Sequence, residues 1–177
     1  YLCKNFGISY TTSMKVLKFG GTSVGSVASI RQIQQIIARE SEDCVVVVSA
    51  LGGITDQLLH AAQLALQTDD AYMEVYQAIR QRHIEMANSL IDNPTVRQML
   101  CHDLETILDE LRSILFGVHL VKDLSAKSEA VIVSYGEQLS SRIVTAALPG
   151  AVRKDSLQFI RTDHKQGQVL LNTDVTE

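Results

Sequence analysis

The 177-residue chain is 46% hydrophobic and 20% charged, a composition typical of one globular domain or of a large part of a bigger protein. Its formal net charge is −4, and its scattered lysines and arginines lack neighbouring aromatic clusters, which argues against nucleic-acid binding. Its three cysteines lie far apart without a Cys-x-x-Cys pair, so the sequence predicts neither a disulfide framework nor a zinc site and favours a reducing cytoplasm.

The first thirteen residues are mixed and polar, and they lack the apolar core of a signal peptide. No later run of apolar residues approaches the length of a membrane span. Met14 directly precedes the first apolar stretch. We therefore expect residues 1–13 to be a disordered extension, the domain to begin at Met14, and no membrane partner.

The first predicted strand, residues 15–19, runs straight into Gly20-Gly21, and an amphipathic helix is predicted over residues 26–39. A glycine pair lets a ligand approach the backbone N–H groups, and Lys18 adds a positive charge. The hydroxyls of Thr22 and Ser23 are candidates for the helix cap. These parts can hold a phosphate or a carboxylate. The alternative is a simple turn in which glycine serves geometry alone.

This stretch is not a Walker A loop, because its lysine precedes the glycines instead of following them. No Gly-x-Gly-x-x-Gly sequence occurs anywhere in the chain. The usual nucleotide fingerprints are therefore excluded.

The second predicted strand, Cys44 to Ser49, contains four consecutive valines, which is typical of a parallel strand buried on both faces. It ends in Gly52-Gly53, with Thr55 or Asp56 as the cap of a helix that reaches residue 66. Ligands of open α/β sheets bind beyond the carboxyl ends of the strands. Two glycine loops on neighbouring strands are therefore expected to face one pocket, which favours an anion site over turn geometry.

Helical periodicity covers residues 70–92 and 95–116, with Asn93-Pro94 between them, so we expect an antiparallel helical hairpin packed on one side of the sheet. We interpret His83 as a structural or surface histidine, because the second half of a zinc-deaminase motif is missing. Residues 117–123 are predicted to be a connector.

A further helix is expected over residues 126–147, capped by Ser125. Gly136 in its middle indicates close approach by a neighbouring backbone or ligand. Taken without context, Glu137 is a solvated helical glutamate. Residues 151–154 and 157–162 are predicted to be short strands.

Three stretches together resemble the aspartokinases of the amino acid kinase family, most of all the aspartokinase part of bifunctional aspartokinase/homoserine dehydrogenases. They are Lys18-Phe19-Gly20-Gly21-Thr22-Ser23-Val24, Val47-Val48-Ser49-Ala50 leading to Gly53-Ile54-Thr55-Asp56, and Ser134-Tyr135-Gly136-Glu137-Gln138-Leu139-Ser140. The resemblance implies a three-layer α/β sandwich with a mainly parallel sheet, incomplete in this chain and carrying a helical-hairpin insertion.

The implied activity is the ATP-dependent phosphorylation of the side-chain carboxylate of L-aspartate to 4-phospho-L-aspartate, in lysine, threonine and methionine biosynthesis. Mg²⁺ is expected on the nucleotide phosphates, with no metal ligand from the protein, and NADP only if a homoserine dehydrogenase domain follows. The resemblance further implies a cytoplasmic homo-oligomer.

The resemblance also assigns residue roles. Lys18 matches the lysine that stabilises charge on the transferring phosphoryl group. The phosphate-binding positions are Lys18, Gly20, Gly21, Thr22, Ser23, Gly52 and Gly53. The aspartate-binding positions are Ser49, Thr55 and Glu137, which reverses the interpretation of Glu137 as solvated.

The chain departs from the family in lacking a later Gly-Arg-Gly-Gly-Ser-Asp motif. We therefore expect residues 14–177 to be the amino-acid substrate part of the catalytic domain, truncated before the nucleotide-binding half and inactive alone. The alternatives are another amino acid kinase, such as glutamate or acetylglutamate kinase, and a non-catalytic anion- or amino-acid-binding module of the same fold.

Overall fold

The computed structural model describes residues 14–165 and 168–172 of the chain, so the predicted extension lies outside the described residues. In chain order the elements are β1 (Lys15–Phe19), α1 (Gly21–Val24), α2 (Val27–Ala38), β2 (Cys44–Val48), α3 (Ile54–Leu66), α4 (Tyr72–Leu90), α5 (Pro94–Val121), α6 (Ala126–Ala147), a 3-10 helix (Ser156–Gln158), β3 (Thr162–Lys165) and β4 (Gln168–Leu171).

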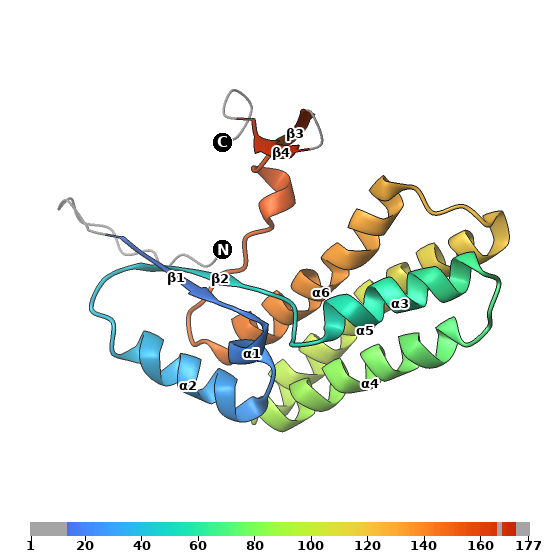
Figure 1. Cartoon of the computed structure of the whole chain (residues 1–177). Coiled ribbons are helices and arrows are strands. Elements are labelled where there is room, and N and C mark those ends of the chain that lie inside the picture. The colour runs from blue at the N-terminus through green and yellow to red at the C-terminus, as the bar shows by residue number, and fades with distance from the viewer. Residues whose placement is uncertain (1–13, 166–167, 173–177) are drawn as a thin grey trace.

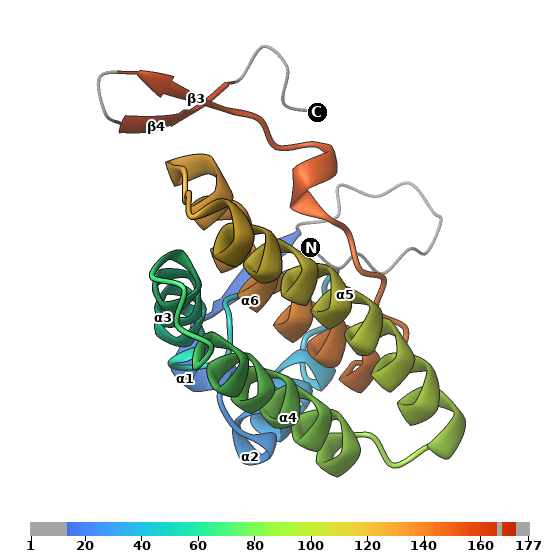
Figure 2. The ribbon, with the colours of Figure 1, turned by 90° about the vertical axis from the view of Figure 1, so that its right-hand side faces the viewer.

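The strands β1 and β2 pair in parallel, from Lys15 opposite Cys44 to Phe19 opposite Val48, and α1 and α2 connect them. This confirms the strand–helix–strand unit expected at the start of the domain. The strands β3 and β4 form a separate antiparallel hairpin. Figures 1 and 2 show this hairpin at the end of the molecule opposite α2, with β1 and β2 between them.

The helices α3 to α6 pack together beside the two strands (Figures 1 and 2). The expected antiparallel pair of helices is confirmed as α4 and α5, but its predicted packing on the sheet is wrong, because the two helices pack mainly on each other and on α3 and α6. The predicted stop at Asn93-Pro94 is confirmed, since α4 ends at Leu90. Asn93 also caps α5, because its side-chain oxygen accepts hydrogen bonds from the N–H groups of Thr95 and Val96 over 3.0 and 3.2 Å.

The predicted connector at residues 117–123 is wrong, because α5 continues to Val121 and ends at Lys122 in a left-handed conformation (φ 57°). Gly117 is tolerated inside the helix because its neighbours Leu115 and Val118 on the inner face are buried. Their burial outweighs the roughly 1 kcal/mol that a helical glycine costs. The tertiary packing of α5 thus stabilises the helix across Gly117.

The predicted strand at residues 157–162 is also wrong. The carboxylate of Asp155 accepts a hydrogen bond from the Leu157 N–H over 3.0 Å and so begins the 3-10 helix. The strand β3 starts only at Thr162, and within residues 151–154 Arg153 alone forms an isolated bridge. The hydrogen bond from the Asp155 side chain therefore outweighs the β propensity of residues 157–162.

The β1–β2 sheet is covered on one face only by the described residues, contrary to the expectation for the valine run. Val46 is buried and joins the core, and Cys44 and Val48 pack against it. Val16, by contrast, is 67% exposed, and the two side chains that flank Val46 are only half-buried. The helices pack on the core-facing side of the strands, so only the side chains on that side are shielded from solvent.

Candidate functional site

The two glycine loops lie against each other at the carboxyl ends of β1 and β2. The Gly52 N–H donates a hydrogen bond to the Gly21 carbonyl over 3.0 Å. A Cβ atom at Gly21 would lie 3.1 Å from the Ala50 carbonyl oxygen and 3.3 Å from the Gly52 Cα atom, so a side chain would push the loops apart. Gly53 is required for its left-handed backbone, with φ of 80°. The predicted proximity of the two loops is confirmed, whereas a pocket that both loops face stays a prediction.

The first loop does not use its predicted hydroxyl cap. The short helix α1 begins at Gly21 without a side-chain cap, and Thr22 and Ser23 are exposed on it. The longer helix α2 is capped instead by Ser26, whose hydroxyl accepts a hydrogen bond from the Ser29 N–H over 3.1 Å. The extra turn of α1 moves the start of the long helix past the expected cap.

The second loop differs from the prediction in the same way. Helix α3 begins at Ile54, directly after Gly53, and has no side-chain cap. Thr55 and Asp56 therefore lie inside its first turn instead of preceding it. The left-handed Gly53 turns the chain into the helix before either side chain can act as a cap.

Lys18 is exposed on β1, and its ammonium makes no hydrogen bond or ion pair with the rest of the described chain. It lies opposite Val47 of β2 in the register of the sheet. Paired residues of neighbouring strands project from the same face, so Lys18 shares its face with Val47. Val47 in turn lines the cavity described next. The lysine is free to reach a ligand placed over that face.

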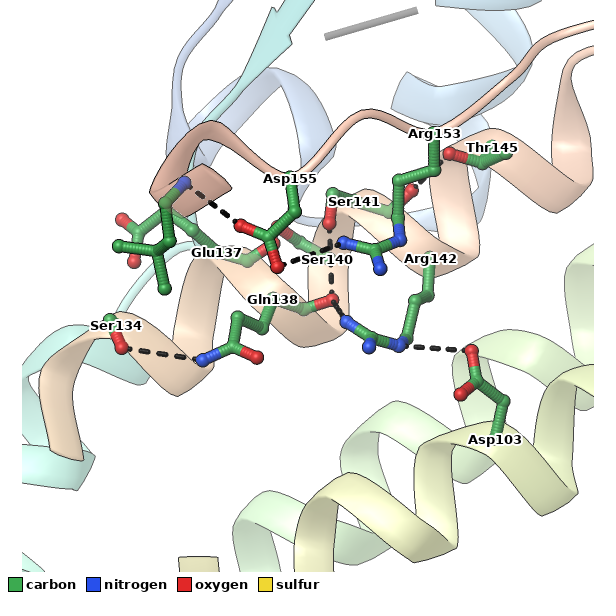
Figure 3. Close-up of polar contacts among 11 residues, drawn as sticks. Asp103, Ser134, Glu137, Gln138, Ser140, Ser141, Arg142, Thr145, Arg153 and Asp155 are labelled. Atoms are coloured by element: carbon green, nitrogen blue, oxygen red, sulfur yellow. Dashed lines mark hydrogen bonds and ion pairs between the residues drawn. The ribbon is translucent and has the colours of Figure 1, made fainter. Parts of the chain in front are cut away.

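A cavity of about 330 Å³ lies beside the end of β2, between α6 and the segment before the 3-10 helix. Figure 3 shows its polar wall, with Glu137 on α6 facing the segment that carries Arg153 and Asp155. A carboxylate and a guanidinium on one cavity suit a zwitterionic ligand. The full lining is Val47, Val48, Ser134, Glu137, Gln138, Ser141, Arg153, Lys154, Asp155, Ser156 and Leu157.

Arg153, one of two basic residues that line the cavity, is held in place by an acidic neighbour. The guanidinium of Arg153 lies 3.8 Å from the carboxylate of Asp155, which also caps the 3-10 helix. Sequence reasoning missed both residues, because it assigned Arg153 to a predicted strand and left Asp155 between two predicted strands. The usable signal was the Asp155-Ser156 pair, whose residue types are typical of a turn.

Glu137 is the one predicted site residue that lines this cavity in the described part of the chain. Its carboxylate also accepts a hydrogen bond from the Ala50 N–H over 3.3 Å and so contacts the second glycine loop. The carbonyl of the preceding residue, Ser49, accepts a hydrogen bond from the Ser140 hydroxyl over 2.7 Å. Glu137 is therefore not a merely solvated glutamate, and it joins the cavity to the loop.

Helix α6 is tied to α5 by Arg142, a third residue that the sequence did not single out. Its Nε donates to the Asp103 carboxylate over 2.9 Å, and its Nη1 donates to the Gln138 carbonyl over 2.9 Å (Figure 3). Burial lowers the pKa of Arg142, and the nearby Arg153 guanidinium lowers it further. This contact fixes the helix that carries Glu137.

His83 lies away from these residues, inside the helices. It is fully buried, and its Nδ1 lies 2.7 Å from the Ile79 carbonyl oxygen. Burial lowers the pKa of His83 to about 4, so the ring is neutral at physiological pH. The structural interpretation of this histidine is confirmed. Across residues 14–165 and 168–172, no three His, Cys, Asp or Glu side chains gather into a metal site.

Residues 13–174 match the amino acid kinase family. The chain belongs to this family. Among curated relatives it is 33% identical to aspartokinase 1, chloroplastic, of Arabidopsis thaliana over 137 residues, which are 75% of this chain and 23% of the relative. It is 35% identical to the aspartokinase of Chlamydia trachomatis over 157 residues, 86% of this chain and 32% of the relative.

The fold of this amino acid kinase chain agrees with a solved one. The crystal structure of Escherichia coli aspartokinase III in complex with aspartate and ADP superposes with a TM-score of 0.77 at 23% identity, over 92% of this chain and 36% of that one. The likeness shows the incomplete α/β fold predicted from the sequence. Relatives include stand-alone aspartokinases and bifunctional aspartokinase/homoserine dehydrogenases, and the chain spans only 15 to 32% of the length of such relatives.

No helix in the part of the chain that the structure describes combines the length and the apolar character needed to cross a bilayer.

Proposed function

We propose that the protein carrying this sequence is an aspartate kinase, which transfers the γ-phosphoryl group of ATP to the side-chain carboxylate of L-aspartate. The observation that carries the proposal is the junction of the two glycine loops beside Glu137. The Gly52 to Gly21 hydrogen bond closes the loops on each other, and the Ala50 to Glu137 hydrogen bond adds the carboxylate. The membership in the amino acid kinase family and the similarity to aspartokinases support it.

The chemistry requires little covalent work from the protein. Phosphoryl transfer depends on positioning and on compensation of charge, and the exposed ammonium of Lys18 can supply that compensation. The attacking carboxylate is already ionised at neutral pH, so no general base is needed. We assign phosphate contacts to the amides of Gly20, Gly21 and Gly53, with the exposed hydroxyls of Thr22 and Ser23 beside them.

Gly52 has a different part in this arrangement. Its N–H is already bonded to the Gly21 carbonyl, so it closes the loops instead of facing a phosphate oxygen. This revises the role that family resemblance alone gave it. In the proposed site Gly52 supports the phosphate-binding amides of its neighbours.

Three residues are proposed to bind aspartate. The carboxylate of Glu137 on the cavity wall suits the substrate ammonium group. The hydroxyls of Ser49 and Thr55 follow β2 on either side of the glycine pair and can orient the substrate carboxylate. Residues 14–177 thus form the amino-acid substrate part of the proposed enzyme, and by themselves they are expected to have negligible activity.

The proposal includes ATP as the phosphoryl donor and Mg²⁺ on its phosphates. The described residues offer no cluster of metal-binding side chains, so we derive no step from the metal. A homo-oligomer, a cytoplasmic location and a place in the biosynthesis of lysine, threonine and methionine also belong to the proposal. The separated cysteines support a reducing compartment.

The test is ADP release by the full-length protein that carries this sequence, measured with and without L-aspartate. We expect release to require aspartate, and we expect Glu137→Ala to raise the KM for aspartate at least tenfold while the KM for ATP changes less than twofold. The experiment would contradict the proposal if aspartate bound without any ADP release, which is the behaviour of a binding module. Wild-type kinetics for Glu137→Ala would disprove the role of Glu137.

A further inference from the structure

Helix α6 contacts the second glycine loop through three residues within one and a half turns, Gly136, Glu137 and Ser140, which we call the α6 clamp. Gly136 and Glu137 meet Ala50, and Ser140 meets the preceding loop residue, Ser49. Residues three and four apart lie on one face of a helix, so these contacts form a single surface. The glycine loop therefore rests on a defined face of α6.

The clamp holds both polar atoms of one peptide group. The carbonyl of Ser49 accepts from the Ser140 hydroxyl over 2.7 Å, and the N–H of Ala50 donates to Glu137 Oε1 over 3.3 Å. This carbonyl and this N–H belong to the same planar Ser49–Ala50 peptide, whose two ends point in opposite directions. Ser140 and Glu137 thus bracket the peptide and fix its orientation.

Ser140 itself is fully buried, one of two polar residues in the described chain that are. Its hydroxyl also lies 3.2 Å from the Glu137 carbonyl of its own helix. A serine inside a helix commonly bonds only to a carbonyl of the preceding turn. The shorter bond to Ser49 leaves the helix, so this hydroxyl links two elements that are 91 positions apart in the sequence.

We propose that Ser140 is a positioning residue, which holds the Ser49–Ala50 peptide so that its N–H orients the Glu137 carboxylate and its flanking residues face the substrate. This inference rests on the proposed function, because it assigns Ser140 to the aspartate side of that site. Loss of the hydroxyl releases the carbonyl end of the peptide. The N–H end then no longer holds the carboxylate in one position.

The test is a double-mutant cycle in the full-length protein, with Ser140→Ala, Glu137→Ala and the pair. We expect Ser140→Ala to raise the KM for aspartate about tenfold and to leave the KM for ATP within twofold. In the Glu137→Ala background the same substitution should change the KM for aspartate by less than twofold, because the group it positions is gone. A merely structural role would not give this non-additivity.

The matched control is Thr145→Val on the same helix. The Thr145 hydroxyl donates only to the Ser141 carbonyl within α6, over 2.6 Å, so its loss removes a hydroxyl without touching the loop. We expect wild-type KM values for both substrates. An equal rise of the KM for aspartate in Ser140→Ala and Thr145→Val would overturn the proposal.

The outcomes separate the two proposals. If the wild-type protein releases no ADP in response to aspartate, the proposed function fails and the role of Ser140 with it. If the wild type is active but Ser140→Ala has an unchanged KM for aspartate, only the positioning role fails. Additive effects of Ser140→Ala and Glu137→Ala would also overturn the positioning role.

Discussion

The substitution Gly136→Ala tests whether α6 and the second glycine loop are packed as closely as the structure shows. A Cβ atom at Gly136 would lie 2.7 Å from the Ala50 Cβ atom, 3.4 Å from Leu58 Cδ1 and 3.5 Å from Ile54 Cγ2. The first distance is shorter than any normal carbon–carbon contact. The Ala50 Cβ atom is bonded directly to the backbone, so it can move only if the loop moves.

The expected magnitude is a balance of two effects. Overpacking a buried site costs about 1–3 kcal/mol. Replacing a helical glycine by alanine recovers about 1 kcal/mol of helix propensity. Because the α6 clamp holds the loop at both ends of one peptide, the loop cannot retreat cheaply, and we expect a net loss of about 1–2 kcal/mol. In a domain of this size that lowers the melting temperature by about 2–8 °C.

The matched control is Gly117→Ala in α5. Gly117 is also a helical glycine, but a Cβ atom there would have no atom within 4 Å. We expect this variant to gain about 0.5–1 kcal/mol of stability. Thermal unfolding of the full-length protein compares the two. If Gly136→Ala were stabilised as much as Gly117→Ala, the close packing of α6 on the loop would be refuted.

Three further predictions follow from single contacts. Lys18→Ala should lower kcat at least about a hundredfold without changing the melting temperature, since the Lys18 side chain is exposed and its ammonium makes no ion pair or hydrogen bond with the described residues. Burial lowers the pKa of His83 to about 4 from an ordinary 6.5, so the unfolded chain binds more protons between these values. The free energy of unfolding should therefore fall by about 3 kcal/mol as the pH drops from 6.5 to 4, and His83→Met should remove this part of the pH dependence. Asp103→Ala should lower the free energy of unfolding by about 1–3 kcal/mol, because it leaves the largely buried Arg142 unpaired. Asp109→Ala removes an exposed ion pair of α5 and should lower the free energy of unfolding by less than about 0.5 kcal/mol.

Each of these has a direct measurement. Steady-state kinetics and thermal unfolding of Lys18→Ala decide the first, and near wild-type kcat would count against the assignment. Urea unfolding at several pH values decides the second, and equal slopes for wild type and His83→Met would show that the histidine is solvated. Equal losses for Asp103→Ala and Asp109→Ala would show that the Arg142 contact is only a surface ion pair.

Local patterns predicted much of this fold correctly. The two strands, their intervening helix and the hairpin of α4 and α5 all follow from periodicity and from the stop at Asn93-Pro94. The cap at Ser125 also forms as expected. These features depend on residues close in sequence. The chemistry of such segments is therefore visible without the fold.

Prediction failed where distant contacts decide the outcome. Gly117 predicts the end of a helix, yet α5 continues to Val121 because it packs on its neighbours. The valines of β2 read as buried on both faces, yet the described helices cover one face only. Ser140 reads as one more polar residue of a helix, and nothing near it in sequence indicates its bond to Ser49.

The sequence by itself indicated the candidate site residues, because the lysine and the glycine pairs stand in a recognisable local setting and the glutamate stands in a motif of the family. Only the tertiary structure decided how they are joined. It closed one glycine loop on the other, committed the Gly52 amide to that closure and set both ends of one peptide against α6. Hydrogen bonds and steric contacts between segments depend on distance in space, which local sequence does not encode.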